Sequence, residues 1–174
     1  PLSGGDINDV YKVESNLGTF CIKLNSAVRF PGMFGAEYKG LFELRKANVI
    51  EIPEPIAHGE VNEESFLLLE FIHTGLPKAD FWVDFGTRLA NLHSHTQDQF
   101  GLSHDNYIGS LYQENTLKNT WQEFFYECRI LPQVKLAIDD SLLEKADLEK
   151  IQKFVYRIPE IFPTELPALL HGDL

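Results

Sequence analysis

Apolar and polar residues alternate along the first part of the chain in a pattern that predicts two antiparallel strands. Asp9–Ser15 alternates in this way, and Asn16–Gly18 supplies a turn. In the next segment, Thr19–Asn25, apolar residues occupy one face and Lys23 lies on the other. The pattern therefore predicts a β-hairpin whose second strand carries a lysine opposite an apolar face.

A helical period follows, and then a second pair of strands. The segment from Pro31 to about Ala47 repeats apolar residues at helical spacing. Ile52–Pro55 interrupts the chain, and the segments Ile56–Val61 and Ser65–Phe71 are predicted strands. The order strand, strand, helix, strand, strand is the plan of the small lobe of a kinase.

The second half of the chain is mainly helical in pattern. Phe81–Ser94 carries apolar residues at helical spacing, whereas Gln97–Gln113 is predicted to be irregular. Two capping boxes, Thr120–Glu123 and Ser141–Glu144, predict the starts of further helices. We expect Pro132 to kink or end the first of these helices.

The pattern changes at Gly75–Pro77, which is predicted to be a linker between two lobes. Residues 1–74 would form a nucleotide-binding lobe, and residues 75–174 the first part of a helical lobe. The predicted fold is therefore α+β and protein-kinase-like, with an antiparallel β small lobe and a mostly helical large lobe that ends at the catalytic loop.

The composition narrows the possible functions. A chain of 174 residues with 44% hydrophobic content can bury a core, and its formal net charge of −11 argues against nonspecific binding of nucleic acid. No apolar run approaches the roughly 20 residues of a membrane span. Cys21 and Cys128 form no CxxC pair and the histidines form no metal-binding pattern, so we expect two buried thiols in a reducing, cytoplasmic compartment.

The last residues of the sequence carry its most informative motif. Apolar Leu169 and Leu170 precede His171-Gly172-Asp173, an arrangement typical of a strand that delivers one aspartate into a tight loop. Kinase-like phosphotransferases place their catalytic carboxylate in this setting. Asp173 is therefore predicted to be the general base, or to orient the acceptor hydroxyl for attack on the γ-phosphate of ATP. The sequence starts without Met and stops after this loop, so we expect it to be the N-terminal part of a longer protein and inactive as it stands.

Four upstream groups are candidates for binding the nucleotide. Adjacent glycines within Ser3–Asn8 let the backbone turn its amides toward phosphate oxygens. Lys23 would neutralise the α- and β-phosphates, Glu37 would orient Lys23 by an ion pair, and the strand ending at Glu70–Ile72 would offer backbone hydrogen bonds to adenine. Taken alone, each group also fits an ordinary turn, a solvated side chain or a core strand, but their order along the chain favours a kinase. The predicted nucleotide-binding residues are Gly4, Gly5, Asp6, Ile7, Asn8, Lys23, Glu37, Glu70, Phe71 and Ile72.

The sequence resembles the fructosamine kinase (ketosamine 3-kinase) family, relatives of the aminoglycoside phosphotransferases and choline kinases, along essentially its whole length. The segments that carry the resemblance are SGGDIN at Ser3–Asn8, FCIKLN at Phe20–Asn25, FGAEYKGL at Phe34–Leu41, LLLEFI at Leu67–Ile72, LANLH at Leu89–His93, FGLSHDNYIGS at Phe100–Ser110, NTWQEFFYECRI at Asn119–Ile130 and PALLHGDL at Pro167–Leu174. The FG…NYIGS segment and the pattern Trp-x-x-Phe-Phe-x-x-x-Arg are particular to fructosamine kinases, so this family is favoured over its relatives.

The resemblance implies ATP-dependent phosphorylation of a ketosamine at its 3-hydroxyl, on fructosamines or ribulosamines that are free or attached to a protein lysine. The phosphorylated adduct would release its amine, so the activity would serve deglycation or metabolite repair. ATP and Mg²⁺ would be required, with the metal ligands expected beyond residue 174. Neither nucleic acid nor a membrane is expected as a partner, and the preferred ketosamine and the oligomeric state stay open.

The resemblance also gives weaker assignments and leaves alternatives. Asn106, Tyr107 and Trp121 map to the acceptor side, with structural packing as the other role open to them. Asp6 stands where some family members have Ser or Cys, so redox regulation through a loop cysteine is not expected. The alternatives are a related kinase acting on an aminoglycoside, choline or homoserine, and a noncatalytic protein that binds a nucleotide or a partner.

Overall fold

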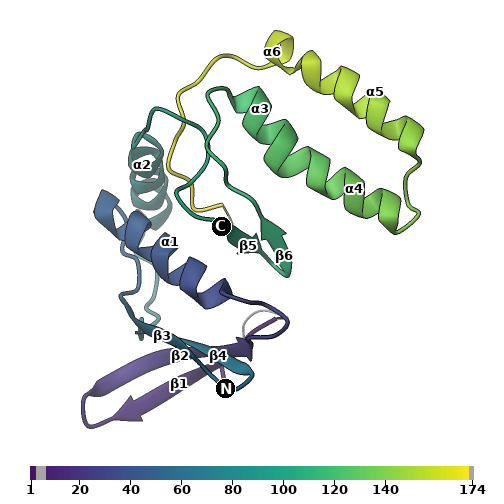
Figure 1. The fold of residues 1–174 in the computed structure, drawn as a ribbon. Coiled ribbons are helices and arrows are strands. Elements are labelled where there is room, and N and C mark those ends of the chain that lie inside the picture. Colours follow the sequence, from purple (N-terminus) through teal and green to yellow (C-terminus); the bar gives the residue numbers. More distant parts are fainter. Residues whose placement is uncertain (3–6, 173–174) are drawn as a thin grey trace. The chain divides into compact units, whose positions relative to one another are not determined.

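The computed structural model describes residues 1–2 and 7–172, which form two compact units. Unit 1 consists of Pro1–His95, Tyr107–Leu111 and the residues from Leu169 onward, and unit 2 consists of Thr96–Asn106 and Tyr112–Ala168. Unit 1 contains an antiparallel sheet with helices, and unit 2 is mainly helical (Figure 1). The α+β class predicted from the sequence is therefore confirmed. None of the helices in the described ranges has both the length and the apolar character that crossing a bilayer requires.

The sheet of unit 1 has four antiparallel strands in the order β1-β2-β4-β3. Its strands are β1 (Asp9–Ser15), β2 (Gly18–Ser26), β3 (Pro55–Val61) and β4 (Glu64–Glu70). The turn after β1 uses Gly18 at φ 136°, and the turn after β3 uses Asn62 at φ 57°. Glycine and asparagine tolerate such positive values better than other residues. Both hairpins predicted from the alternation are confirmed.

Helix α1 (Met33–Ala47) lies against one face of this sheet (Figure 1). Residues of the helix and of the two central strands form the buried cluster between them, which consists of Phe34, Leu67 and Leu69 with Cys21, Tyr38 and Leu41 packed around it. Side chains alternate between the faces of a strand, so Cys21 and Lys23 lie on the same face of β2. The helix therefore covers the face of the sheet that carries the lysine.

Helix α2 (Phe81–His93) follows the linker as predicted, but the final strand predicted before His171 is not formed in the described residues. In unit 1, the backbone N–H of Leu169 donates to the carbonyl oxygen of His95 at 2.9 Å. In unit 2, Thr96 and Ala168 make an isolated antiparallel bridge. The two apolar residues before His171, Leu169 and Leu170, are too few to extend these contacts into a ladder of strand pairs.

Unit 2 contains two helical stretches. They comprise α3 (Trp121–Phe125), the π-helical turn η1 (Tyr126–Ile130), α4 (Leu131–Asp139), α5 (Lys145–Tyr156) and α6 (Ile158–Ile161). The first begins as predicted, because the backbone N–H of Glu123 donates to the Oγ1 atom of Thr120 at 3.2 Å. Pro132 does not end this helix. It lies in the first turn of α4, where a residue without an N–H is tolerated, directly after the π-helical turn.

The capping box predicted at Ser141–Glu144 is wrong. Ser141 lies in a turn at φ 60°, and Glu144 is the residue that precedes the first turn of α5. The backbone N–H of Glu144 donates to the Oδ2 atom of Asp147 at 3.1 Å. Two overlapping segments of the sequence, Ser141–Glu144 and Glu144–Asp147, each have an acidic residue three positions after a possible N-cap. Because Ser141 lies in a turn, only the second segment stands at the start of the helix.

A short hairpin occupies part of the stretch predicted to be irregular. Its strands are β5 (Asn106–Ile108) and β6 (Leu111–Gln113), and Gly109 lies between them at φ 55°. The residues of its tip, Tyr107–Leu111, belong to unit 1, whereas Asn106 and Tyr112 at its base belong to unit 2. Strands of three residues are too short for alternation in the sequence to reveal them.

Candidate functional site

The structure brings Lys23 and Glu37 together as an ion pair. The Nζ atom of Lys23 on β2 donates to the Oε1 and Oε2 atoms of Glu37 on α1, at 2.7 and 2.9 Å. The two side chains are 22% and 30% exposed, so the pair is partly shielded and still open to a ligand. The ring of Phe34 lies beneath the ammonium group, with its centroid 6.0 Å from Nζ. The ion pair expected from the sequence is present, while its role toward phosphates stays a prediction.

Asn8, at the end of the predicted phosphate loop, is fixed to the sheet. Its Oδ1 atom accepts a hydrogen bond from Nδ2 of Asn25 at 3.0 Å. The Oδ1 atom of Asn25 in turn accepts from the hydroxyl of Ser65, which is only 4% exposed. Gly4, Gly5 and Asp6 lie outside the described residues. The loop therefore ends at a point that β2 and β4 hold in place.

Asn25 and Ser65 are residues that the sequence analysis missed. They occupy opposite positions in the register of β2 and β4, and each is a polar residue directly beside an apolar residue of its strand, Leu24 in β2 and Phe66 in β4. A buried polar group costs free energy unless it has a partner, so a pair of this kind in adjacent strands is a usable signal. The signal could be recognised only once the register of the two strands was known.

The tip of the hairpin β5–β6 lies beside the end of the phosphate loop in unit 1. The hydroxyl of Tyr107 donates to the carbonyl oxygen of Pro31, just before α1, at 3.0 Å. A Cβ atom placed on Gly109 would lie 3.8 Å from the Cδ1 atom of Ile7. Tyr107 and Ile7, which were predicted to serve the acceptor and the nucleotide, are thus brought to the same part of unit 1.

The predicted adenine-binding segment leaves β4 and enters the linker. The carboxylate of Glu70 accepts the backbone N–H of Glu54 at 3.1 Å, and the N–H of Glu70 donates to the carbonyl of Glu54 at 2.9 Å. The Nζ atom of Lys12 lies 5.3 Å from the ring centroid of Phe71, and Ile72 is 51% exposed. The side chain and the backbone N–H of Glu70 therefore both have a structural partner in Glu54, and its role toward adenine stays a prediction.

Asp173, the predicted catalytic base, lies outside the described residues. The backbone that leads to it is described as far as Gly172, which has φ 92°. A positive value of this kind is usual for glycine in a tight turn. The structure thus supports a turn before Asp173 and says nothing of the carboxylate itself.

Trp121 has a packing role in unit 2. Its ring stacks on Phe125 with centroids 4.7 Å apart and an interplanar angle of 12°. The ring centroid of Phe162 lies 5.5 Å from that of Trp121. The neighbouring Gln122 donates from Nε2 to the carbonyl oxygen of Val155 at 3.0 Å. These contacts join the helical stretch that begins at α3 to the stretch formed by α5 and α6, so packing accounts for Trp121.

The thiol of Cys21 lies on the same face of the sheet as Lys23. Burial raises the pKa of this thiol, and the nearby ammonium of Lys23 opposes the shift only in part. Burial also raises the pKa of Cys128 in unit 2. Both cysteines are free, so each stays a protonated thiol at neutral pH and has little nucleophilic character. The expectation of two buried thiols holds fully for Cys128 and in part for Cys21, which is half-buried.

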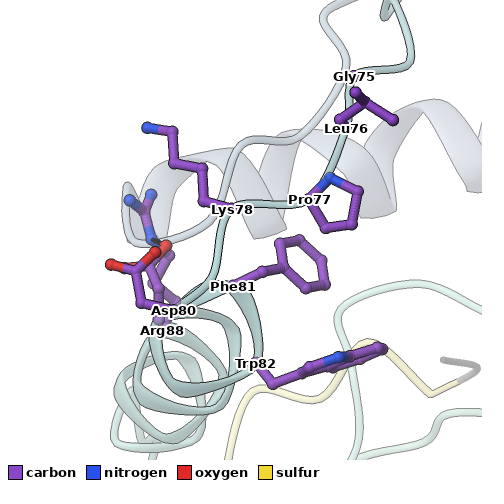
Figure 2. Close-up of a pocket in the computed structure, with 9 residues that line it drawn as sticks. Gly75, Leu76, Pro77, Lys78, Asp80, Phe81, Trp82 and Arg88 are labelled. Atoms are coloured by element: carbon purple, nitrogen blue, oxygen red, sulfur yellow. Dashed lines mark ion pairs between the residues drawn. The ribbon is translucent and has the colours of Figure 1, made fainter.

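A hollow of about 660 Å³ lies beside the linker and the first turns of α2 (Figure 2). Figure 2 shows Pro77, Phe81 and Trp82 along one part of it and the charged side chains of Lys78, Asp80 and Arg88 along another. It is lined by none of the predicted nucleotide-binding residues that the structure describes. The hollow is therefore distinct from the site built around Lys23.

The comparisons with known proteins agree with one another. The family model for fructosamine kinase matches residues 1–174. The chain is 36% identical over 176 residues to a "Probable ketoamine kinase" of Enterococcus faecium, covering 100% of this chain and 61% of that protein. It is 33% identical over 178 residues to the "Protein-ribulosamine 3-kinase, chloroplastic" of Arabidopsis thaliana, covering 99% of this chain and 54% of that protein.

A solved structure has the same fold. The crystal structure of a Haemophilus somnus protein, provisionally named a fructosamine-3-kinase, superposes with a TM-score of 0.82 at 29% identity, over 96% of this chain and 56% of that one. The protein-kinase-like fold predicted from the sequence is thereby confirmed. The chain spans about three fifths of the length of the curated relatives it matches.

Proposed function

Because the chain belongs to the fructosamine kinase family, we propose that the protein at its full length transfers the γ-phosphate of ATP to a hydroxyl group of a ketosamine. The ion pair between Lys23 and Glu37 supports this most strongly, because it holds a half-shielded ammonium on the strand β2, whose Asn25 also binds Asn8 at the end of the predicted phosphate loop. The substrate class follows the relatives, which are named as a ketoamine kinase and a ribulosamine 3-kinase.

In this proposal the nucleotide is bound mainly by residues of unit 1. Lys23 neutralises the α- and β-phosphates. Glu37 holds the ammonium in place before ATP binds, so the lysine loses less side-chain entropy on binding than a free lysine would. Backbone amides of Gly4–Asn8 contact phosphate oxygens, and the backbone of Glu70–Ile72 contacts adenine. The anchored Asn8 supports the first of these contacts, because the loop then has a fixed end.

Asp173 acts on the acceptor in the transfer step. The hydroxyl oxygen on carbon 3 of the ketosamine attacks the γ-phosphorus in line with the bridging oxygen of ADP. The bond between the γ-phosphorus and that oxygen breaks, ADP leaves with its electron pair, and the hydroxyl proton passes to the Asp173 carboxylate. The family pattern at Pro167–Leu174 supports this role.

Mg²⁺ is part of the proposal as the ion that accompanies ATP. Within residues 1–2 and 7–172, no group of three or more His, Cys, Asp or Glu is arranged to hold a metal ion. The described residues thus do not form its site, and we place its ligands in the part of the relatives that this chain does not span. When bound, the ion would neutralise charge on the phosphates.

The remaining proposals concern organisation and setting. Residues 1–74 would act as the nucleotide-binding lobe and residues 75–174 as the first part of the helical lobe. The acceptor would be a free ketosamine or a glycated lysine of a protein, and the reaction would take place in the cytoplasm. The Tyr107 side chain would help to shape the acceptor side, since it is held next to the start of α1.

An acceptor panel tests the proposal. The full-length protein is supplied with ATP, Mg²⁺ and one acceptor at a time, and formation of ADP is followed. We expect turnover with fructosyl-lysine or ribulosyl-lysine and only background with choline, homoserine or an aminoglycoside. Selective turnover of one of the latter would move the function to a related kinase. Binding of ATP without turnover of any acceptor would favour a noncatalytic nucleotide-binding protein.

A further inference from the structure

Asn25 on β2 joins three other parts of unit 1 through its side-chain amide. Its Nδ2 atom donates to Oδ1 of Asn8, just before β1, at 3.0 Å, and to the Sδ atom of Met33, the first residue of α1, at 3.2 Å. Its Oδ1 atom accepts the hydroxyl of Ser65 on β4, which is only 4% exposed. Both polar atoms of the Asn25 amide therefore have partners within the same unit.

The partners of Asn25 leave a single orientation for its amide. A thioether sulfur accepts a hydrogen bond but has no proton to donate, so the amide atom that faces Met33 is the nitrogen. The buried hydroxyl of Ser65 would cost free energy without a partner, and Oδ1 of Asn25 supplies its acceptor. The hydrogen bonds therefore run in one direction, from Ser65 to Asn25 and from Asn25 to Asn8.

This direction decides which atom of Asn8 is open to a ligand. The Oδ1 atom of Asn8 is occupied by the N–H of Asn25, so the amino group at Nδ2 points elsewhere. Within the part of the chain that the structure describes, no atom accepts a hydrogen bond from this amino group, and Asn8 is partly exposed. An amide with an occupied oxygen offers only donors, and donors suit an anion.

Asn8 and Lys23 are neighbours on one face of the sheet. Lys23 and Asn25 are two residues apart in β2, so their side chains lie on the same face. Val10 is the register partner of Lys23, and Asn8 lies two residues before Val10, with its side chain bonded to Asn25. Diagonal neighbours of this kind lie roughly 7–8 Å apart. A phosphate chain in contact with the ammonium of Lys23 therefore comes within reach of the amino group of Asn8.

We propose that the Nδ2 atom of Asn8 binds a phosphate oxygen of the nucleotide, and that Asn25 and Ser65 are positioning residues for this contact. Ser65 fixes the amide of Asn25, and Asn25 occupies the oxygen of Asn8, so the amino group of Asn8 is directed to the phosphates before ATP binds. This side-chain contact adds to the backbone amides of the proposed phosphate loop. The inference rests on the proposed function for the identity of the anion.

A double-mutant cycle on ATP binding to the full-length protein tests the proposal. Asn8→Ala removes the donor, so we expect the Kd for ATP to rise about tenfold or more. Ser65→Ala removes only a hydroxyl that does not touch ATP, and the Kd should rise about fivefold. In the Asn8→Ala background, Ser65→Ala should change the Kd by less than about twofold, because Ser65 acts through Asn8. An unchanged Kd in Asn8→Ala, or single effects that multiply in the double variant, would overturn the proposal.

Two further substitutions at Ser65 support the cycle. Ser65→Thr keeps the hydroxyl and should bind ATP within about twofold of the wild type. Ser65→Cys keeps the volume and has a weaker donor, so it takes the place of Ser65→Ala in the cycle should that variant fail to fold. Wild-type affinity for ATP in a folded Ser65→Ala or Ser65→Cys variant would remove Ser65 from the positioning role.

Ser26→Ala is the matched control. Ser26 follows Asn25 in β2, so its side chain lies on the other face of the sheet, where its Oγ atom accepts the N–H of Arg29 at 3.3 Å. The variant loses the same group as Ser65→Ala without touching Asn25, and its Kd for ATP should equal that of the wild type. An equal rise in Ser26→Ala and Ser65→Ala would point to a general disturbance of the sheet, and the proposal would be wrong.

Steady-state kinetics separates this inference from the proposed function. In Ser65→Ala the KM for ATP should rise, while the KM for the ketosamine stays within about twofold. A wild-type protein that bound ATP but turned over no acceptor would contradict the proposed function, and the binding cycle would then decide on Asn8, Asn25 and Ser65 alone. Selective turnover of a ketosamine together with wild-type ATP affinity in Asn8→Ala would uphold the proposed function and overturn this inference.

Discussion

At the scale of single residues, the proposed nucleotide site depends on the ammonium group of Lys23. Lys23→Ala removes the charge that would face the phosphates and leaves the carboxylate of Glu37 near them without its partner. We expect the Kd for ATP to rise about tenfold or more and the turnover to fall as well. Titration with a fluorescent ATP analogue measures the first effect.

The control for this variant is Lys46→Ala on the exposed face of α1. Lys46 pairs with Glu43, but its side chain is 68% exposed, and such pairs contribute little. This variant should bind ATP as the wild type does. Equal affinity of Lys23→Ala and Lys46→Ala for ATP would remove Lys23 from the phosphate site.

Asp105 gives a prediction of pH dependence. The hydroxyl of Tyr112 and the backbone N–H of Asn115 hold the pKa of this carboxyl below its usual range. A group with a lowered pKa stabilises the folded state above its unfolded pKa, and this contribution is lost as the pH falls through the folded pKa. Asp105→Asn should therefore be less stable than the wild type at neutral pH. The difference between their free energies of unfolding should shrink as the pH falls from about 5 to about 3.

Urea unfolding at several pH values measures the effect of Asp105→Asn. The unfolding midpoints of the wild type and the variant should approach each other in acid. A constant difference across the range would mean that the charge of Asp105 does not contribute and that only the shape of its side chain matters.

Single residues also show how far the sequence could predict the site. The pairing of Lys23 with Glu37 could be expected, because the alternation of a strand and the period of a helix place both on facing surfaces. The anchoring of Asn8 by Asn25 could not, because it depends on the register of β2 and β4. Contacts set by the pairing of distant strands have no local signal.

At the scale of elements, the loop that ends at the hairpin is constrained by Gly101. This glycine has φ 122°, and a Cβ atom on it would lie 2.6 Å from the carbonyl oxygen of Asn115. Gly101→Ala should lower the free energy of unfolding by about 2 kcal/mol or more, because the backbone strain and the clash add. Thermal or urea unfolding provides the measurement.

Gly40→Ala on α1 is the matched control for Gly101→Ala. Gly40 is helical, and nothing lies within 4 Å of the position of an added Cβ atom. Alanine should therefore stabilise the helix by about 0.5–1 kcal/mol. Similar stability of the two variants would show that the loop around Gly101 relaxes to accept a side chain.

The elements differ in how well the sequence predicted them. The two hairpins and α1 have long periodic patterns and short turns, and their bounds agree with the prediction within a few residues. The π-helical turn and the strands β5 and β6 were missed. These short elements are stabilised by hydrogen bonds to distant residues such as Arg129 and Asn115, and so their own pattern is too weak to reveal them.

At the scale of the whole molecule, nucleotide binding and phosphate transfer are expected to depend on different residues. Asp173→Asn in the full-length protein should cut turnover by roughly 10²–10⁴, the usual contribution of a positioned base. The Kd for ATP should hardly change, because the proposed nucleotide contacts lie in the loop Gly4–Asn8, on β2 and α1, and at the end of β4 with the linker that follows it. Turnover at the wild-type level would exclude Asp173 as the base.

The most direct test of the account is to identify the product by ³¹P NMR. The full-length protein is incubated with ATP, Mg²⁺ and fructosyl-lysine, and the spectrum is followed over time. We predict that a phosphate monoester coupled to the proton on carbon 3 of the sugar forms first, in step with ADP, and that inorganic phosphate appears only later, as the adduct breaks down and releases its amine. Inorganic phosphate that forms from the start without this monoester, or ATP that stays intact, would contradict the proposed function.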